Sequence, residues 1–148
     1  MIFSNGDKMA LTVQNTAQNG TPEAFAEGFA ESDSNARLRI DPKVLNLVHL
    51  ARYTCGDVAL EEELLGLFKD QAILQFENIE QALDKPAWDM ALHTLKGSAR
   101  GIGAEYVADL SAMLEKTGFD GVMAERQRLT SQLKHAVAVC IVTIETLQ

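Results

Sequence analysis

The sequence of 148 residues has few of the features that mark secreted, metal-binding or membrane-spanning proteins. Its two cysteines, Cys55 and Cys140, are too few for a disulfide framework and form no C-x-x-C pair. No apolar run approaches the roughly 20 residues that cross a bilayer. The first ten residues include Asp7 and no apolar core, so they do not read as a secretory signal. We therefore expect a cytoplasmic protein with reduced thiols.

Positive charge is also scarce, because 13 lysines and arginines stand against 21 acidic residues and leave a net charge of −8. An acidic protein repels both the phosphate backbone of nucleic acids and anionic membrane surfaces. We predict that neither is a partner. The sequence has no G-x-x-x-x-G-K-[ST] loop and no room for an ATP-binding domain, so an ATP-dependent kinase is not expected.

The chain divides into a polar first part and a regularly patterned second part. Residues 1–39 are rich in Ser, Asn, Gln, Thr and Gly, which predicts a largely flexible arm. A short helix at 22–31 is possible within it, since Thr21 can cap a helix that has Pro22 at its first position. Residues 40–148 contain the apolar periodicity of a packed domain.

This second part shows helical spacing and no alternating strand pattern. Helices are predicted over 41–51, 57–84, 86–101, 104–117 and 122–147. Short connections between amphipathic helices favour an all-α fold, an antiparallel up-and-down four-helix bundle with a short N-terminal helical appendage. For the helix at 57–84, the pattern predicts a buried face of Leu60, Leu64, Leu67, Phe68, Ala72, Ile79 and Leu83. Its charged residues, including Glu61, are expected largely to avoid the centre of that face.

One histidine stands out on the helix that begins at Pro86. Its apolar side is predicted to consist of Trp88, Ala91, Leu92, Leu95, Ala99 and Ile102. His93 points roughly 150° away from their centre, toward solvent. An exposed imidazole is largely neutral near pH 7 and is therefore a nucleophile. The other histidines, His49 and His135, are interpreted as incidental surface residues.

The neighbours of His93 on this outer face are unusual for an ordinary surface. They are Asp89, Met90, Lys96, Gly97 and Arg100. A glycine inside a helix destabilises it by about 1 kcal/mol relative to alanine, but Gly97 leaves no side chain one turn from His93. Lys96 is close enough to stabilise negative charge on a transferring phosphoryl group. Geometry alone still leaves an ordinary surface histidine as the alternative.

The residues around His93 closely resemble a known signature. The segment 93–104 reads H-T-L-K-G-S-A-R-G-I-G-A, and histidine-containing phosphotransfer (Hpt) domains follow H-x-L-K-G-S-[SA]-x-x-[IL]-G-A. The stretch 64–83 is similar to the family's preceding helix, and 110–115 to its L-x-x-x-L-E stretch. The resemblance covers about residues 40–147, and the arm before it matches no family that we can name.

The resemblance implies that His93 is the phosphoacceptor and that Lys96 positions or neutralises the phosphoryl group. It implies that Gly97 gives the partner access, whereas Asp89, Met90 and Arg100 are assigned to docking from the helical wheel. The implied partners are receiver domains of response regulators or hybrid histidine kinases. No cofactor of its own is expected, since the receiver would bring Mg²⁺.

Besides the kinase, the alternative to this phosphocarrier is a non-catalytic helical docking module for receiver or kinase domains, in which His93 is inert. Asp89 and His93 are four residues apart, a spacing that could hold part of a metal site. No further helix offers the E-x-x-H pattern of carboxylate-bridged bundles, so no metal is predicted. Ser98 faces the bundle on the helical wheel and is interpreted as a packing or local hydrogen-bonding residue.

Overall fold

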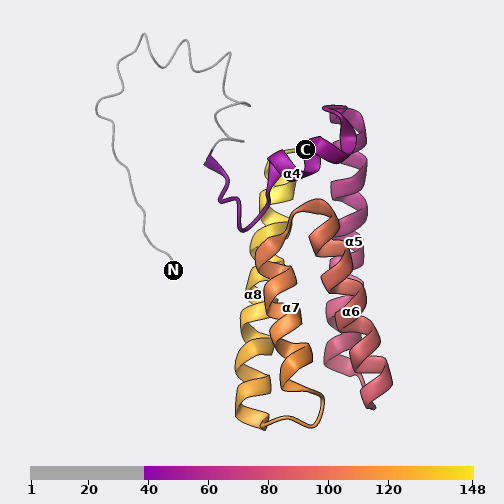
Figure 1. Cartoon of the computed structure of the whole chain (residues 1–148), viewed down its shortest axis with the longest axis vertical. Helices are drawn as coiled ribbons and strands as arrows, with labels where there is room; N and C mark the ends of the chain where they lie inside the picture. The colour runs from indigo at the N-terminus through magenta and orange to yellow at the C-terminus, as the bar shows by residue number, and fades with distance from the viewer. Residues whose placement is uncertain (1–38) are drawn as a thin grey trace, which may run out of the picture. The chain divides into compact units, whose positions relative to one another are not determined.

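The computed structural model describes residues 39–148, and all regular secondary structure in that range is helical (Figure 1). Five helices occur there: α4 (Leu47–Thr54), α5 (Val58–Gln81), α6 (Lys85–Ile102), α7 (Glu105–Thr117) and α8 (Met123–Thr146). The arm predicted for residues 1–39, with its helix at 22–31, lies outside the described residues except for Arg39. None of the described helices is both long and apolar enough to span a membrane.

The four longer helices form an antiparallel up-and-down bundle. Helix α5 packs against α6 and α8, while α7 packs against α6 and α8 from the other side (Figure 1). The short α4 lies against α5 and α6 at one end of the bundle. The predicted four-helix bundle with a short helical appendage is confirmed, and this architecture fixes which helix faces are open.

Polar side chains determine where the helices begin. Asp57 accepts a hydrogen bond from the backbone N–H of Leu60 at 3.1 Å, which caps α5. Asp84 accepts one from the N–H of Ala87 at 2.9 Å and caps α6, with a proline in the first turn. The predicted boundary near Asp84 is therefore confirmed, although α5 ends three residues earlier, at Gln81.

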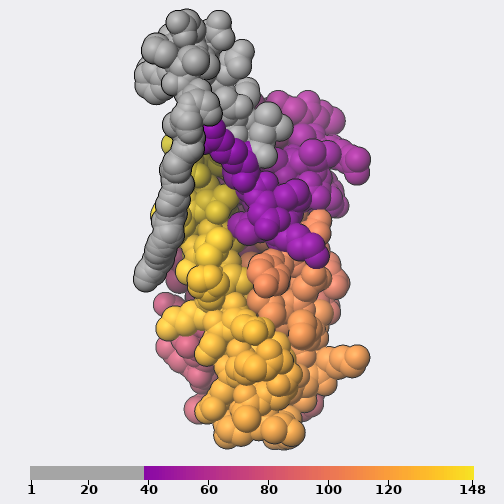
Figure 2. All heavy atoms as spheres, turned by 90° about the vertical axis from the view of Figure 1, so that its left-hand side faces the viewer, coloured from indigo at the N-terminus to yellow at the C-terminus, as the bar shows by residue number. Residues whose placement is uncertain are grey.

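The corner between α6 and α7 is sealed by the segment that precedes α4. Gly103 has φ +89° there, and an added Cβ would lie 2.7 Å from the backbone oxygen of Asn46. The N–H of Asn46 donates to the oxygen of Gly103 at 2.8 Å, and the N–H of Tyr106 donates to that of Lys43 at 2.8 Å. Figure 2 shows this segment, in indigo, lying across the end of the bundle. Only glycine fits so close an approach.

The inward faces of α6 and α8 are those that the sequence predicts. All six predicted apolar residues of α6 are buried. On α8 the apolar spacing predicts a stripe that ends at Leu147, and its members Leu129, Leu133, Val137, Cys140 and Ile144 are buried, whereas Leu147 is partly buried. Burial raises the pKa of the Cys140 thiol to about 12, because the thiolate would lose its hydration. Helix α6 is strongly amphipathic in sequence, and its rotation about its axis follows from that pattern.

The predicted face of α5 is partly wrong. The buried residues are Glu61, Leu65, Phe68, Ala72, Phe76 and Ile79. Leu60, Leu67 and Leu83 are exposed, although they were expected in the core. Glu61 was expected to avoid the centre of this face, but it is buried and accepts a hydrogen bond from the Thr54 hydroxyl at 3.1 Å. Apolar residues surround α5 on nearly every side, so periodicity alone does not select the face that packs.

The predicted start of the first helix is also wrong. Asp41 does not begin a helix; its carboxylate accepts a hydrogen bond from the N–H of Lys43 at 2.9 Å and closes a turn. Asn46 caps α4 instead, with its side-chain oxygen 3.1 Å from the N–H of His49. A turn competes with the helix here because aspartate binds the backbone two residues ahead.

Candidate functional site

Helix α6 directs His93 away from the core. Its Asp84 cap fixes where the helix begins, and the buried Trp88 and Leu92 fix its rotation. The His93 side chain lies on the opposite side and is 75% exposed. The exposure predicted from the helical wheel is confirmed.

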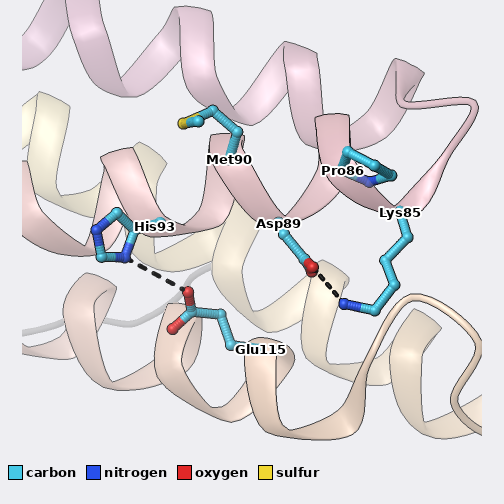
Figure 3. Close-up of a pocket in the computed structure, with 6 residues that line it drawn as sticks. All are labelled: Lys85, Pro86, Asp89, Met90, His93 and Glu115. Atoms are coloured by element: carbon cyan, nitrogen blue, oxygen red, sulfur yellow. Dashed lines mark hydrogen bonds and ion pairs between the residues drawn. The ribbon is translucent and has the colours of Figure 1, made fainter.

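Glu115, on α7, lies between two basic side chains of α6. Its Oε2 is 3.9 Å from Nδ1 of His93, within ion-pair range for a protonated imidazole (Figure 3). Its Oε1 is 2.5 Å from Nζ of Lys96. Both Glu115 and Lys96 are partly buried. One carboxylate therefore connects the exposed imidazole to the neighbouring ammonium group.

The position of Lys96 differs from the helical-wheel expectation. The wheel groups Lys96 with the open outer face, whereas the structure places it on the flank that packs against α7. Its ammonium group is paired with Glu115 and is not directed at solvent. The wheel cannot foresee this, because the partner lies on another helix. Sequence reasoning assigned no role to Glu115, although the family-like stretch 110–115 ends on it.

A shallow depression of about 470 Å³ lies beside His93 (Figure 3). Its lining consists of Lys85, Pro86, Asp89, Met90, His93 and Glu115. Asp89 and Lys85 form an ion pair, and the hydrogen bond and charge of Asp89 raise the pKa of Lys85. Met90 is exposed and adds an apolar surface to the rim. The structure therefore brings Asp89, Met90 and His93 together.

Gly97 and Arg100 extend this surface along α6. Gly97 is exposed, and within residues 39–148 no atom lies within 4 Å of where its Cβ would be. Arg100 is exposed and has no ion pair in the described part of the chain. Ser98 is partly buried, but its hydroxyl makes none of the hydrogen bonds found in this range. The face next to His93 is thus open and partly cationic.

The remaining histidines lie elsewhere. His135 is exposed, as predicted. His49 is not a plain surface residue: its Nε2 is buried with no hydrogen-bond partner among residues 39–148, and its ring packs edge-on against Tyr53 at 5.1 Å. In the region that the structure describes, no group of three or more His, Cys, Asp or Glu side chains could hold a metal ion.

A comparison with protein families matches the Hpt domain over residues 63–139. The match covers more than half of the chain and includes His93, Lys96, Gly97 and Glu115. The chain belongs to the Hpt domain family. Hpt domains carry out phosphotransfer in two-component signalling and interact with receiver domains. Comparisons with curated proteins and with solved structures gave no match.

Proposed function

We propose that this Hpt domain accepts a phosphoryl group on His93 from a receiver aspartate and passes it to another receiver in a phosphorelay. The observation that supports this most strongly is the orientation of the imidazole. Nδ1 faces Glu115, and the other ring nitrogen points away from it (Figure 3). Nε2 is therefore the nitrogen that an incoming phosphorus can reach.

The transfer is a displacement at phosphorus. The Nε2 lone pair attacks, a P–N bond forms, and the bond between phosphorus and the aspartate oxygen breaks, so that the receiver carboxylate leaves with the electron pair. Glu115 acts as a positioning residue, because a carboxylate near Nδ1 favours the tautomer whose proton is on that nitrogen. It also balances the positive charge that develops on the ring. Attack by a second aspartate reverses these steps.

Lys96 supplies positive charge close to the reaction. The Glu115 carboxylate contacts both the Lys96 ammonium and the His93 ring, so the two basic groups lie on either side of one anion. A phosphoryl group on Nε2 adds negative charge, which the ammonium can stabilise. Lys96 therefore serves both to hold Glu115 and to offset the charge of the phosphoryl group.

The surface around His93 suits a receiver domain. Gly97 leaves the backbone bare, Met90 offers apolar contact, and Asp89 and Arg100 place opposite charges at the two ends of the face. The receiver would supply the Mg²⁺ and most of the transition-state stabilisation. A cytoplasmic location remains a prediction.

Incubation with a phosphorylated receiver tests the proposal. Wild type is expected to acquire an acid-labile label that His93→Gln lacks. His135→Gln is the matched control, since it removes another exposed histidine and is expected to label as wild type does. Equal labelling of the His93→Gln and wild-type proteins would refute the proposal. Receiver binding without transfer to wild type would instead favour the docking module, and labelling by ATP alone would indicate a kinase.

A further inference from the structure

A row of leucines lies on the outer face of α5, on the side that its bundle neighbours leave open. Leu60, Leu67 and Leu74 are all exposed, Leu67 by 58% and Leu74 by 48%. Seven residues make almost two helical turns, so the three side chains form one line about 21 Å long. In Figure 1, α5 runs along one edge of the bundle beside α6. We call this line the leucine ridge.

The ridge has the spacing of a coiled-coil seam. Leu64, which is partly buried, and Gln71 complete a four-then-three repeat with the three leucines. This repeat is the pattern that lets a second helix pack along the first with its side chains inserted between them. The packing within the bundle uses only Leu64 of this repeat, which packs against the core, and α5 faces its neighbours mainly with Leu65, Phe68 and Phe76. The three leucines of the ridge therefore have the spacing of a helix-packing surface, and no helix within residues 39–148 covers them.

The charge beside the ridge is of one sign. Glu63, Asp70 and Glu77 are exposed and follow the same seven-residue spacing. Among the described residues none of them forms an ion pair. On the other flank, Glu61 and Phe68 are buried in the bundle. A helix that packs on the ridge thus meets a continuous acidic row on a single side.

We infer that the leucine ridge binds an amphipathic helix of a partner protein that has a row of lysines or arginines beside its apolar stripe. Flanking charges select the partner of a coiled-coil helix, and the unpaired acidic row selects basic residues. A second copy of this chain fits less well. Antiparallel pairing of two α5 helices would set the acidic row against itself, in a chain whose net charge is −8.

The ridge is separate from the proposed phosphotransfer chemistry. His93 contacts Glu115 on α7, whereas the ridge lies on α5, and α6 packs between these two helices. The inference does not depend on a role for His93, so each can fail without the other.

The experiment uses the full chain and two fluorescein-labelled synthetic helices of about 21 residues, long enough to span the ridge. Both peptides have leucines in the four-then-three spacing, and they differ in having lysines or glutamates in the adjoining row. Fluorescence anisotropy is expected to show at least tenfold tighter binding of the lysine peptide. The variant E63K/D70K/E77K is expected to reverse this preference.

The variant L67K/L74K is expected to weaken binding of the lysine peptide at least tenfold. Val142→Lys is the matched control, because Val142 is an exposed apolar residue on α8; it is expected to bind as wild type does. Circular dichroism checks that each variant folds. Tight binding to L67K/L74K would overturn the inference, and so would a peptide preference that the charge reversal leaves unchanged. A concentration-dependent dimer that L67K/L74K abolishes would assign the ridge to a second copy and also overturn it.

Discussion

Replacing Gly97 with alanine should stabilise the protein and impair its proposed activity at the same time. Gly97 lies in the interior of α6, where alanine is favoured by about 1 kcal/mol. Beyond the adjoining backbone of α6, the added methyl group meets no atom of the described chain within 4 Å, so it causes no clash inside the bundle. For a domain of about 100 residues, this gain corresponds to a rise in Tm of roughly 4 °C or more.

The same methyl group would stand in the path of a docking receiver. Gly97 is one turn from His93, about 6 Å along the helix axis. Forcing an extra methyl group into a packed contact costs about 1 to 3 kcal/mol, and each 1.4 kcal/mol is a factor of about ten. We therefore expect kcat/KM for transfer from a phosphorylated receiver to fall about tenfold or more.

Gly101→Ala is the matched control for this variant. Gly101 is also exposed, lies in α6 and has open space at its Cβ position within the described range, but it is about 12 Å along the axis from His93. Its substitution should raise Tm by a smaller amount, because Gly101 is close to the helix end, and should leave the transfer rate nearly unchanged. Thermal unfolding by circular dichroism and single-turnover transfer measure the two quantities. If Gly97→Ala is more stable but transfers at the wild-type rate, Gly97 is not needed for receiver access. If Gly97→Ala is less stable than wild type, the expected gain from alanine inside α6 is wrong.

Two further outcomes test the site and the core. Glu115→Ala should slow transfer about tenfold without weakening receiver binding. Glu115→Gln keeps an acceptor oxygen and should recover part of the rate. An unchanged rate in Glu115→Ala would contradict the positioning role. Iodoacetamide at pH 8 should modify the exposed Cys55 but not Cys140, whose pKa of about 12 leaves only about one thiolate in ten thousand. Mass spectrometry should find a second label only after unfolding in urea, and rapid double labelling of the folded protein would disagree with the buried thiol.

Sequence reasoning succeeds for α6 and is incomplete for α5, for a physical reason. On α6 the apolar residues lie on one side only, so the direction of His93 follows from the spacing of Trp88, Leu92 and Leu95. On α5 apolar residues occur on nearly every side, and packing against α6 and α8 decides that Leu65 is buried while Leu67 is exposed. Periodicity specifies a face only when the other faces are polar.

The contact between Lys96 and Glu115 shows a second limit. The two residues are 19 positions apart on different helices, and a single sequence does not give the rotation of one helix against the next. The motif places Lys96 near His93, but only the packed bundle shows that a carboxylate connects them. The predicted start of the first helix, at Asp41, is also wrong, because an aspartate that closes a turn and one that caps a helix have similar sequence signals.

The contact between the segment before α4 and the α6–α7 corner determines where a shortened fragment of this domain can begin. Ala104, before the first residue of α7, provides no side-chain cap, and the backbone oxygen of Lys43 takes the amide hydrogen of Tyr106 in its place. The region matched to the family starts only at residue 63. A fragment trimmed to that boundary would leave the amide of Tyr106 without its acceptor, the backbone oxygen of Lys43. We therefore expect the smallest autonomous folding unit to extend upstream to at least Asp41, beyond the limits by which the family is recognised.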